Sequence, residues 1–208
     1  MRYFSQLKAA LFLACLYPLL RLFWLAYTDR LGANPIEFIT RSLGTWTLVF
    51  LLITLSITPM RNLSGWPALI RLRRMAGLFA FFYALLHFIT YLWLDQFFDL
   101  EAIYRDVIKR PFITLGFAAF VLMIPLAITS TNAMMKKLGG KRWQMLHRLI
   151  YAVAIFAVLH YWWLVKKDIT QPLIYAAVLA LLLAYRLWIM HKRRVLTRTA
   201  ESTSHDVK

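Results

Sequence analysis

Cysteine is nearly absent from this sequence of 208 residues, in which Cys15 stands alone. The chain therefore forms no internal disulfide and offers no cluster of thiolate metal ligands. Charged residues are also scarce, at 16% of the chain against about 25% in soluble domains. The G-x-G-x-x-G pattern is missing, and no long polar segment is available to form a nucleotide-binding domain. These absences argue against a water-soluble enzyme.

Apolar residues are abundant instead. They make up 61% of the chain and give a mean hydropathy of +0.60, whereas soluble domains are about 45–50% apolar. The formal net charge of +16 is a feature that nucleic-acid-binding proteins share. In so apolar a chain, however, basic loops on the cytoplasmic side of a membrane explain the charge more simply. We expect a lipid bilayer and no nucleic acid as the surroundings of this protein.

Six apolar segments are each long enough to cross the roughly 30 Å hydrocarbon core of a bilayer. They cover residues 7–27, 43–60, 75–94, 112–130, 146–165 and 173–190. Their apolar residues are continuous rather than alternating, which indicates helices rather than barrel strands. The sequence predicts an all-α integral membrane protein, with a single six-helix domain over residues 1–190 and a basic tail over residues 191–208.

The distribution of lysine and arginine predicts the orientation. Basic residues gather at the N-terminus, in the loops after the second and fourth segments, and in the tail. In the other loops the basic residues are nearly matched by aspartate and glutamate. The positive-inside rule therefore places both termini in the cytoplasm and makes residues 95–111 the longest outward segment, where a short interfacial helix is expected.

Ionisable residues inside membrane segments are costly and are therefore candidates for function. His87 and His160 lie about twelve and fourteen residues into the third and fifth segments, which run in the same direction. At 1.5 Å per residue both reach a similar depth towards the outer side. Two neutral imidazoles at one depth suit the axial positions of a haem iron. The alternative for each histidine alone is a hydrogen bond to a neighbouring helix.

A third histidine, His147, precedes His160 by thirteen residues, or roughly 20 Å of helix. This spacing leaves room for a second haem nearer the cytoplasm. The matching position on the third segment is Arg73, with Arg74 beside it, and neither is a usual iron ligand. The inner haem would then have one histidine opposite an arginine or an open position, or the arginines would bind haem propionates. Because thirteen residues turn an ideal helix by about 220°, a bend is needed between His147 and His160.

Three strings of residues resemble one family. They are residues 71–78 followed by Leu86-His87, residues 110–116 leading to Thr129-Ser130-Thr131, and residues 141–151 followed by His160-Tyr161. Together they resemble the MsrQ family, the haem-binding membrane subunits of the protein-methionine-sulfoxide reductase system, over residues 7–190. That family belongs to the wider ferric-reductase-like transmembrane family, which typically carries two histidine pairs. Arg73 departs from the wider pattern at the inner position.

The resemblance implies a non-catalytic electron-transfer subunit in a bacterial inner membrane. Electrons from quinol or a reduced flavin would pass through one or two haem b groups to MsrP, a periplasmic molybdenum-containing catalytic partner that reduces methionine sulfoxide in oxidised proteins. FMN is implied as a further cofactor by the resemblance only. The expected haem ligands are His87 and His160. His147 would ligate an inner haem or help to bind the donor, while Arg73 and Arg74 would neutralise propionates or a flavin phosphate.

Two other functions remain open at this point. The first is a self-contained transmembrane ferric or quinone reductase that needs no dedicated partner. The second is a non-redox transporter or assembly factor that uses its histidines to relay protons. The six segments contain no pair of Gly/Pro-interrupted helices in corresponding positions, which disfavours transport.

Overall fold

A computed structural model describes residues 2–165 and 167–205, which form helices joined by short loops, with no strand among them. The α-helices are α1 (Arg2–Tyr27), α2 (Pro35–Ser64), α3 (Ile70–Thr90), α4 (Leu100–Lys109), α5 (Pro111–Ile128), α6 (Asn132–Leu138), α7 (Gly140–His147), α8 (Leu149–Leu164) and α9 (Thr170–His205). A short 3-10 turn, Pro67–Leu69, precedes α3, and a π-helical turn, Tyr91–Asp95, follows it. The predicted all-α class is confirmed.

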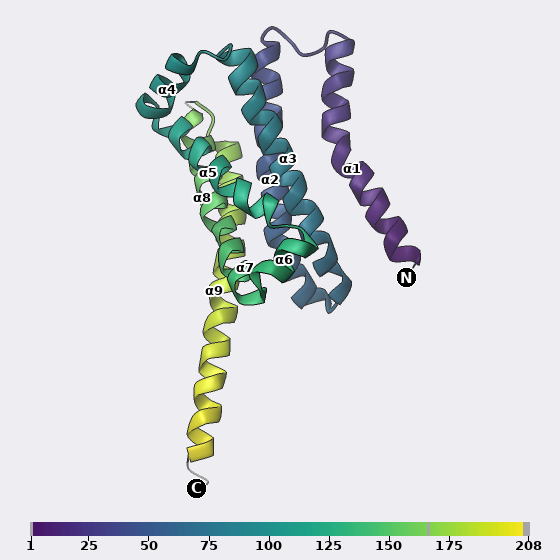
Figure 1. Cartoon of the computed structure of the whole chain (residues 1–208), viewed down its shortest axis with the longest axis vertical. Coiled ribbons are helices and arrows are strands. Elements are labelled where there is room, and N and C mark those ends of the chain that lie inside the picture. Colours follow the sequence, from purple (N-terminus) through teal and green to yellow (C-terminus); the bar gives the residue numbers. More distant parts are fainter. Residues whose placement is uncertain (1, 166, 206–208) are drawn as a thin grey trace.

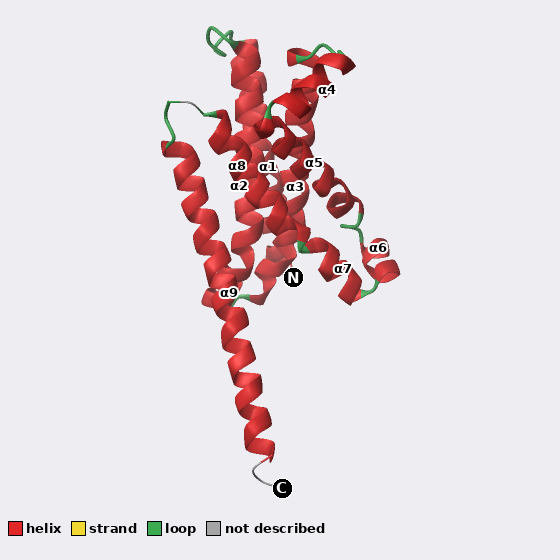
Figure 2. Ribbon diagram, turned by 90° about the vertical axis from the view of Figure 1, so that its left-hand side faces the viewer, coloured by secondary structure: helices red, strands yellow, loops and turns green. Residues whose placement is uncertain are grey.

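Within the described part of the chain, six helical stretches are long and apolar enough to cross a membrane, as predicted. Antiparallel helices α2 and α3 form one closely packed pair, and α5 and α8 form the other. Helix α9 packs on α2 and α8, while α1 lies beside the α2–α3 pair (Figures 1 and 2). One end of the bundle, here the α4 end, carries the α1–α2 loop and α4. The opposite end, here the α7 end, carries the N-terminus, α6 and α7.

Helix α2 is longer than its predicted segment, 43–60, at both ends. It begins at Pro35 because the side chain of Asn34 accepts a hydrogen bond from the backbone N–H of Glu37 and proline suits the first helical position. It ends at Gly65, whose φ of 66° is the left-handed conformation typical of a helix stop. Helix boundaries here follow capping residues that lie outside the apolar run.

Two further boundaries bear on the site. The predicted fifth segment, 146–165, is interrupted at Arg148, which separates α7 from α8. The interruption lies between His147 and His160, where a bend is expected if both histidines ligate haems. At the other end of the chain, α9 continues beyond residue 190 into the expected tail and projects past the α7 end (Figure 1).

Aromatic side chains fill the centre of the bundle. The ring of Phe50 on α2 stacks on Tyr83 and Phe79 of α3, with centroid distances of 5.2 and 5.7 Å. Tyr83 is fully buried, and its hydroxyl donates a hydrogen bond of 2.8 Å to the carbonyl of Cys15 on α1. Because this packing fixes α3 one turn before His87, it also fixes the histidine.

Candidate functional site

His87 on α3 and His160 on α8 face each other inside the bundle. Their ring centroids are 6.2 Å apart, and the ring planes are inclined by 74°. They come from the two different helix pairs, α2–α3 and α5–α8. The structure thus brings together the two histidines that their matched depth singled out.

Both imidazoles are held by the same kind of hydrogen bond. Nδ1 of His87 lies 2.9 Å from the carbonyl oxygen of Thr40, and Nδ1 of His160 lies 2.6 Å from that of Phe112. A carbonyl oxygen only accepts, so each Nδ1 carries the hydrogen and donates it. In the neutral ring this leaves Nε2 with a free lone pair, which is the tautomer required of a metal ligand.

A glycine lies one helical turn after each of these carbonyls. A Cβ atom at Gly44 would lie 3.1 Å from the His87 ring, and one at Gly116 would lie 2.8 Å from the His160 ring. Both distances are shorter than ordinary van der Waals contacts, so a side chain at either position would displace an imidazole. The two glycines therefore let the rings approach the helix backbone closely enough to reach its carbonyls.

The histidine pair borders a cavity of about 290 Å³ between the two helix pairs. Its other lining residues are mostly apolar and include Leu51, Phe88 and Phe120. Two imidazoles bonded to one metal ion from opposite sides, at about 2.0 Å each, have centroids about 6 Å apart, close to the observed 6.2 Å. Among residues 2–165 and 167–205, no group of three or more His, Cys, Asp or Glu could hold a metal ion. The pair therefore fits a haem iron, whose remaining ligands belong to the porphyrin.

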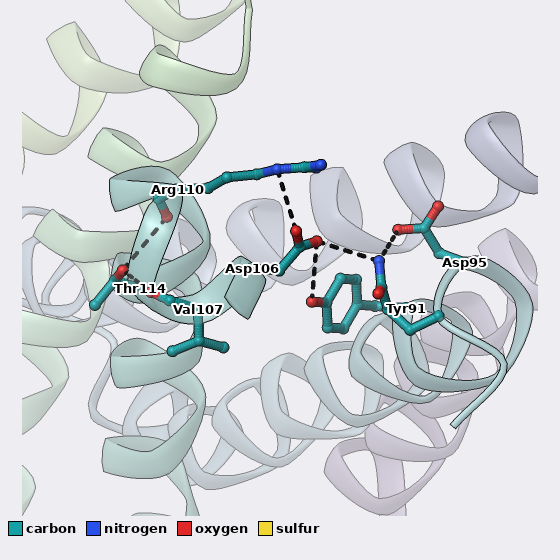
Figure 3. Close-up of polar contacts among 7 residues, drawn as sticks. Tyr91, Asp95, Asp106, Val107, Arg110 and Thr114 are labelled. Atoms are coloured by element: carbon teal, nitrogen blue, oxygen red, sulfur yellow. Dashed lines mark hydrogen bonds and ion pairs between the residues drawn. The ribbon is translucent and has the colours of Figure 1, made fainter. Parts of the chain in front are cut away.

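A polar cluster lies at the α4 end, where Tyr91, Asp95 and Arg110 line the cavity; Figure 3 shows its contacts. The carboxylate of Asp106 on α4 accepts hydrogen bonds from Tyr91 at 3.5 Å and Gln96 at 3.2 Å, and it pairs with Arg110 at 3.3 Å. Arg110 also lines the cavity, as does Arg41 on α2. Sequence analysis missed these two arginines, because their distance from the histidines along the chain gave no signal. Both are paired with carboxylates, Arg110 with Asp106 and Arg41 with Glu37 at 2.7 Å, so an acidic haem edge would compete with these carboxylates for the two arginines.

His147 lies at the α7 end, against the end of α5. Its Nε2 is 3.1 Å from the hydroxyl of Thr129, and its ring stacks on Trp143 with a centroid distance of 3.9 Å. The indole N–H of Trp143 donates to the carbonyl of Thr129 at 2.9 Å. Thr129 follows the last residue of α5, and its hydroxyl holds His147 in place.

A second cavity, of about 650 Å³, opens beside His147 and contains both predicted arginines. Five arginines from four parts of the chain line it: Arg61, Arg73, Arg74, Arg148 and Arg186. The sequence has no Asp or Glu between residues 38 and 94 or between residues 107 and 167. The segments that form most of this cavity therefore supply no carboxylate to balance its charge, and the site suits an anionic or carbonyl-bearing ligand.

Sequence analysis did not assign Arg61, Arg148 or Arg186 to this cavity, and Arg186 on α9 lies within a membrane-spanning segment. It donates hydrogen bonds to the Tyr151 hydroxyl at 2.6 Å and to the Leu55 carbonyl at 2.8 Å. Its Nε is buried and has no hydrogen-bond partner. A signal was present, because an arginine inside a membrane segment is costly and marks a functional position.

Comparison with known proteins identifies the family to which the chain belongs. Residues 40–158 match the family described as "Ferric reductase like transmembrane component". A protein of Herminiimonas arsenicoxydans named protein-methionine-sulfoxide reductase heme-binding subunit MsrQ is 61% identical over 91% of this chain and 88% of its own length. Proteins of the same name from Azospira oryzae and Rhodospirillum rubrum are 59% and 54% identical, over 89% and 90% of this chain and 80% and 90% of their own lengths. The chain therefore belongs to the ferric-reductase-like transmembrane family and, within it, to the MsrQ family.

Proposed function

We propose that this protein binds haem b between α3 and α8 and carries electrons across the bacterial inner membrane to a methionine sulfoxide reductase. One observation carries the proposal: His87 and His160 face each other with each Nδ1 hydrogen donated to a carbonyl. That arrangement prepares two Nε2 lone pairs for a single iron. The names of the relatives, which describe heme-binding subunits, support it.

The membrane orientation follows from charge. The α7 end carries basic residues such as Arg71, Lys136 and Lys141, whereas the loops of the α4 end contain Asp95, Asp99 and other carboxylates. The positive-inside rule then places the α7 end and both termini in the cytoplasm. The haem site lies towards the periplasm, at a depth from which a periplasmic partner can be reduced.

In this site His87 and His160 would hold the haem iron, and Arg41 and Arg110, which now pair with Glu37 and Asp106, would be the cations available to its propionates. Haem supplies one-electron redox chemistry when it is bound. The protein residues orient the two rings, raise their basicity through the Nδ1 hydrogen bonds, and exclude water with apolar neighbours. Each of these contributions sets the reduction potential of the bound group.

The cavity at the α7 end is the proposed site for the electron donor. Its arginines, including Arg73 and Arg74, suit the carbonyl oxygens of a quinone or the phosphate of a flavin such as FMN. His147 would help to bind the donor, because it lines this cavity and is held in place by the Thr129 hydroxyl and the Trp143 ring. An inner haem ligated by His147 is the alternative for the same space.

The partner would be MsrP, a periplasmic molybdenum-containing subunit that docks at the α4 end. Reduction of methionine sulfoxide to methionine and water consumes two electrons and two protons, and the partner would catalyse it. The protein itself would remain a non-catalytic subunit in the repair of oxidised periplasmic proteins. A self-contained ferric or quinone reductase, and a non-redox transporter or assembly factor, are the competing functions.

The test is a visible spectrum of the detergent-purified full chain before and after dithionite, followed by reduction with a quinol. A sharp Soret band that shifts on reduction, with resolved α and β bands, is the expected result. Addition of MsrP and methionine sulfoxide should then reoxidise the haem. A colourless protein from haem-replete cells would refute the proposal. Reoxidation by soluble ferric chelates at the same rate as by MsrP would favour the self-contained reductase.

A further inference from the structure

A groove of about 730 Å³ lies between α1 and α3, separate from the histidine pair. Its walls are apolar and include Phe12 on α1 and Leu78 and Phe82 on α3. Its α7 end is basic and is formed by Lys8, Arg71 and Arg74. One end of the groove is thus positively charged, and the rest of it is lined by apolar side chains.

The shape of the groove follows from where α1 contacts the bundle. Midway along its length, α1 is joined to α3 by the edge-to-face contact of Phe12 with Phe79, at 5.1 Å, and by the hydrogen bond from Tyr83 to Cys15. Towards its N-terminus α1 diverges from the α2–α3 pair (Figure 1). The groove therefore opens laterally and towards the α7 end, where lipid headgroups meet the protein.

The basic end of the groove has no carboxylate to balance it on either helix. Residues 1–28 and 38–94, which contain all of α1 and α3, include no Asp or Glu. Arg71 lies 5.3 Å from the ring centroid of Phe4, and one nitrogen of Arg74 donates to the side chain of Asn132 at 2.5 Å. Both partners are neutral, so the positive charge remains available to an anion.

The apolar wall on α3 is a continuous face that begins at the basic end. Arg71, Met75, Leu78 and Phe82 follow one another at intervals of four, three and four residues, which places them on one side of the helix. This face differs from the one that carries Arg73 and His87. A ligand in the groove would extend from the charged surface into the membrane along α3.

We propose that this groove is a binding site for one anionic phospholipid of the surrounding bilayer. The phosphate would lie between Lys8 and Arg71, and an acyl chain would lie along Leu78 and Phe82. Basic pockets between membrane helices on the cytoplasmic side are suited to anionic headgroups. A zwitterionic lipid leaves the basic charge uncompensated, and free phosphate leaves the apolar wall uncovered. The lipid would add to the few direct contacts, such as Phe12 with Phe79, that join α1 to α3 at the groove.

The test compares the full-length wild-type protein with a variant carrying Lys8→Gln and Arg71→Gln. Each is purified in detergent, mixed with phosphatidylglycerol or phosphatidylcholine, and examined by native mass spectrometry for retained lipid. The wild type should retain one phosphatidylglycerol in preference to phosphatidylcholine. The variant should bind phosphatidylglycerol roughly 10- to 30-fold more weakly, because two favourable charges are lost. Lys136→Gln with Lys137→Gln is the matched control, since both lysines are exposed at the same end and outside the groove.

Two further variants separate a specific site from a loss of folding. Leu78→Trp fills the groove without changing the charge and should also reduce lipid retention. Lys8→Arg with Arg71→Lys keeps both positive charges and should retain lipid as the wild type does. An unchanged visible spectrum in each variant shows that the bundle is intact. Equal loss in the control variant, unchanged retention in the Gln variant, or equal stabilisation of the wild type by inorganic phosphate would overturn the proposal. The proposal would also be overturned if Leu78→Trp released a neutral quinone from the protein and left phosphatidylglycerol bound.

Discussion

Replacement of Gly116 by alanine is the sharpest test of how the imidazoles are held. The new Cβ would lie 2.8 Å from Nδ1 and 2.9 Å from Cε1 of His160, which falls short of an ordinary contact of 3.4 Å by 0.6 Å. The ring must therefore move away from α5 and lengthen its hydrogen bond to Phe112, now 2.6 Å. In a helix without this contact, the same change would stabilise the protein by about 0.5–1 kcal/mol.

The expected cost of this overpacking is about 1–3 kcal/mol. If it acts on the haem-bound state, affinity for haem falls by roughly 5- to 150-fold. The measurement is the haem-to-protein ratio after purification, together with the reduced α band and the midpoint potential. Gly44→Ala should have a smaller effect in the same direction, because its Cβ would lie 3.1 Å from the His87 ring.

Gly77→Ala on α3 is the matched control, because its Cβ would make only an ordinary contact of 3.6 Å with Thr54. It should keep haem and leave the spectrum unchanged. If Gly116→Ala retains haem with the same spectrum and potential as Gly77→Ala, then the close approach of ring and helix does not control ligation. The steric argument would then be wrong.

Three other predictions concern the histidine pair, the donor cavity and the hydrogen bond between α1 and α3. His87→Ala and His160→Ala should each abolish the low-spin haem spectrum, whereas a retained spectrum in both would exclude them as axial ligands. Arg73→Gln should slow reduction of the haem by quinol about tenfold or more, because one charge-assisted contact to the donor is lost. The dithionite-reduced spectrum should stay unchanged. Equal rates of reduction by quinol in the variant and the wild type would exclude this arginine from the donor site. Tyr83→Phe should lower the stability to thermal unfolding by about 1 kcal/mol, since the carbonyl of Cys15 loses its hydrogen-bond donor, and an unchanged Tm would show that this bond does not hold α1.

The helices could largely be predicted from the sequence, because apolar length alone identifies membrane segments. Their ends could not be, as α2 shows. The local cap formed by Asn34 and Pro35 extends this helix well beyond its apolar run. The interruption at Arg148 also escaped prediction from the apolar run, because no proline or glycine marks it.

The site was predictable only in part, for a related reason. His87 and His160 could be paired because depth along a helix is a one-dimensional property. The carbonyls of Thr40 and Phe112 could not be found in this way, because backbone groups leave no signature in the sequence. Arg186 was detectable as a charge within a membrane segment, but its neighbours Tyr151 and Leu55 come from other helices and required the structure.

Each histidine is held by the other member of its own helix pair, His87 by α2 and His160 by α5. The two halves of the site can therefore form separately, with each ring already oriented before the halves meet. A group that bonds to both rings then links the α2–α3 pair to the α5–α8 pair. We therefore expect haem insertion to be a late step of assembly. Its binding energy adds directly to the cohesion between the pairs, so the empty protein should be cleaved by proteases between α3 and α5 sooner than the loaded one.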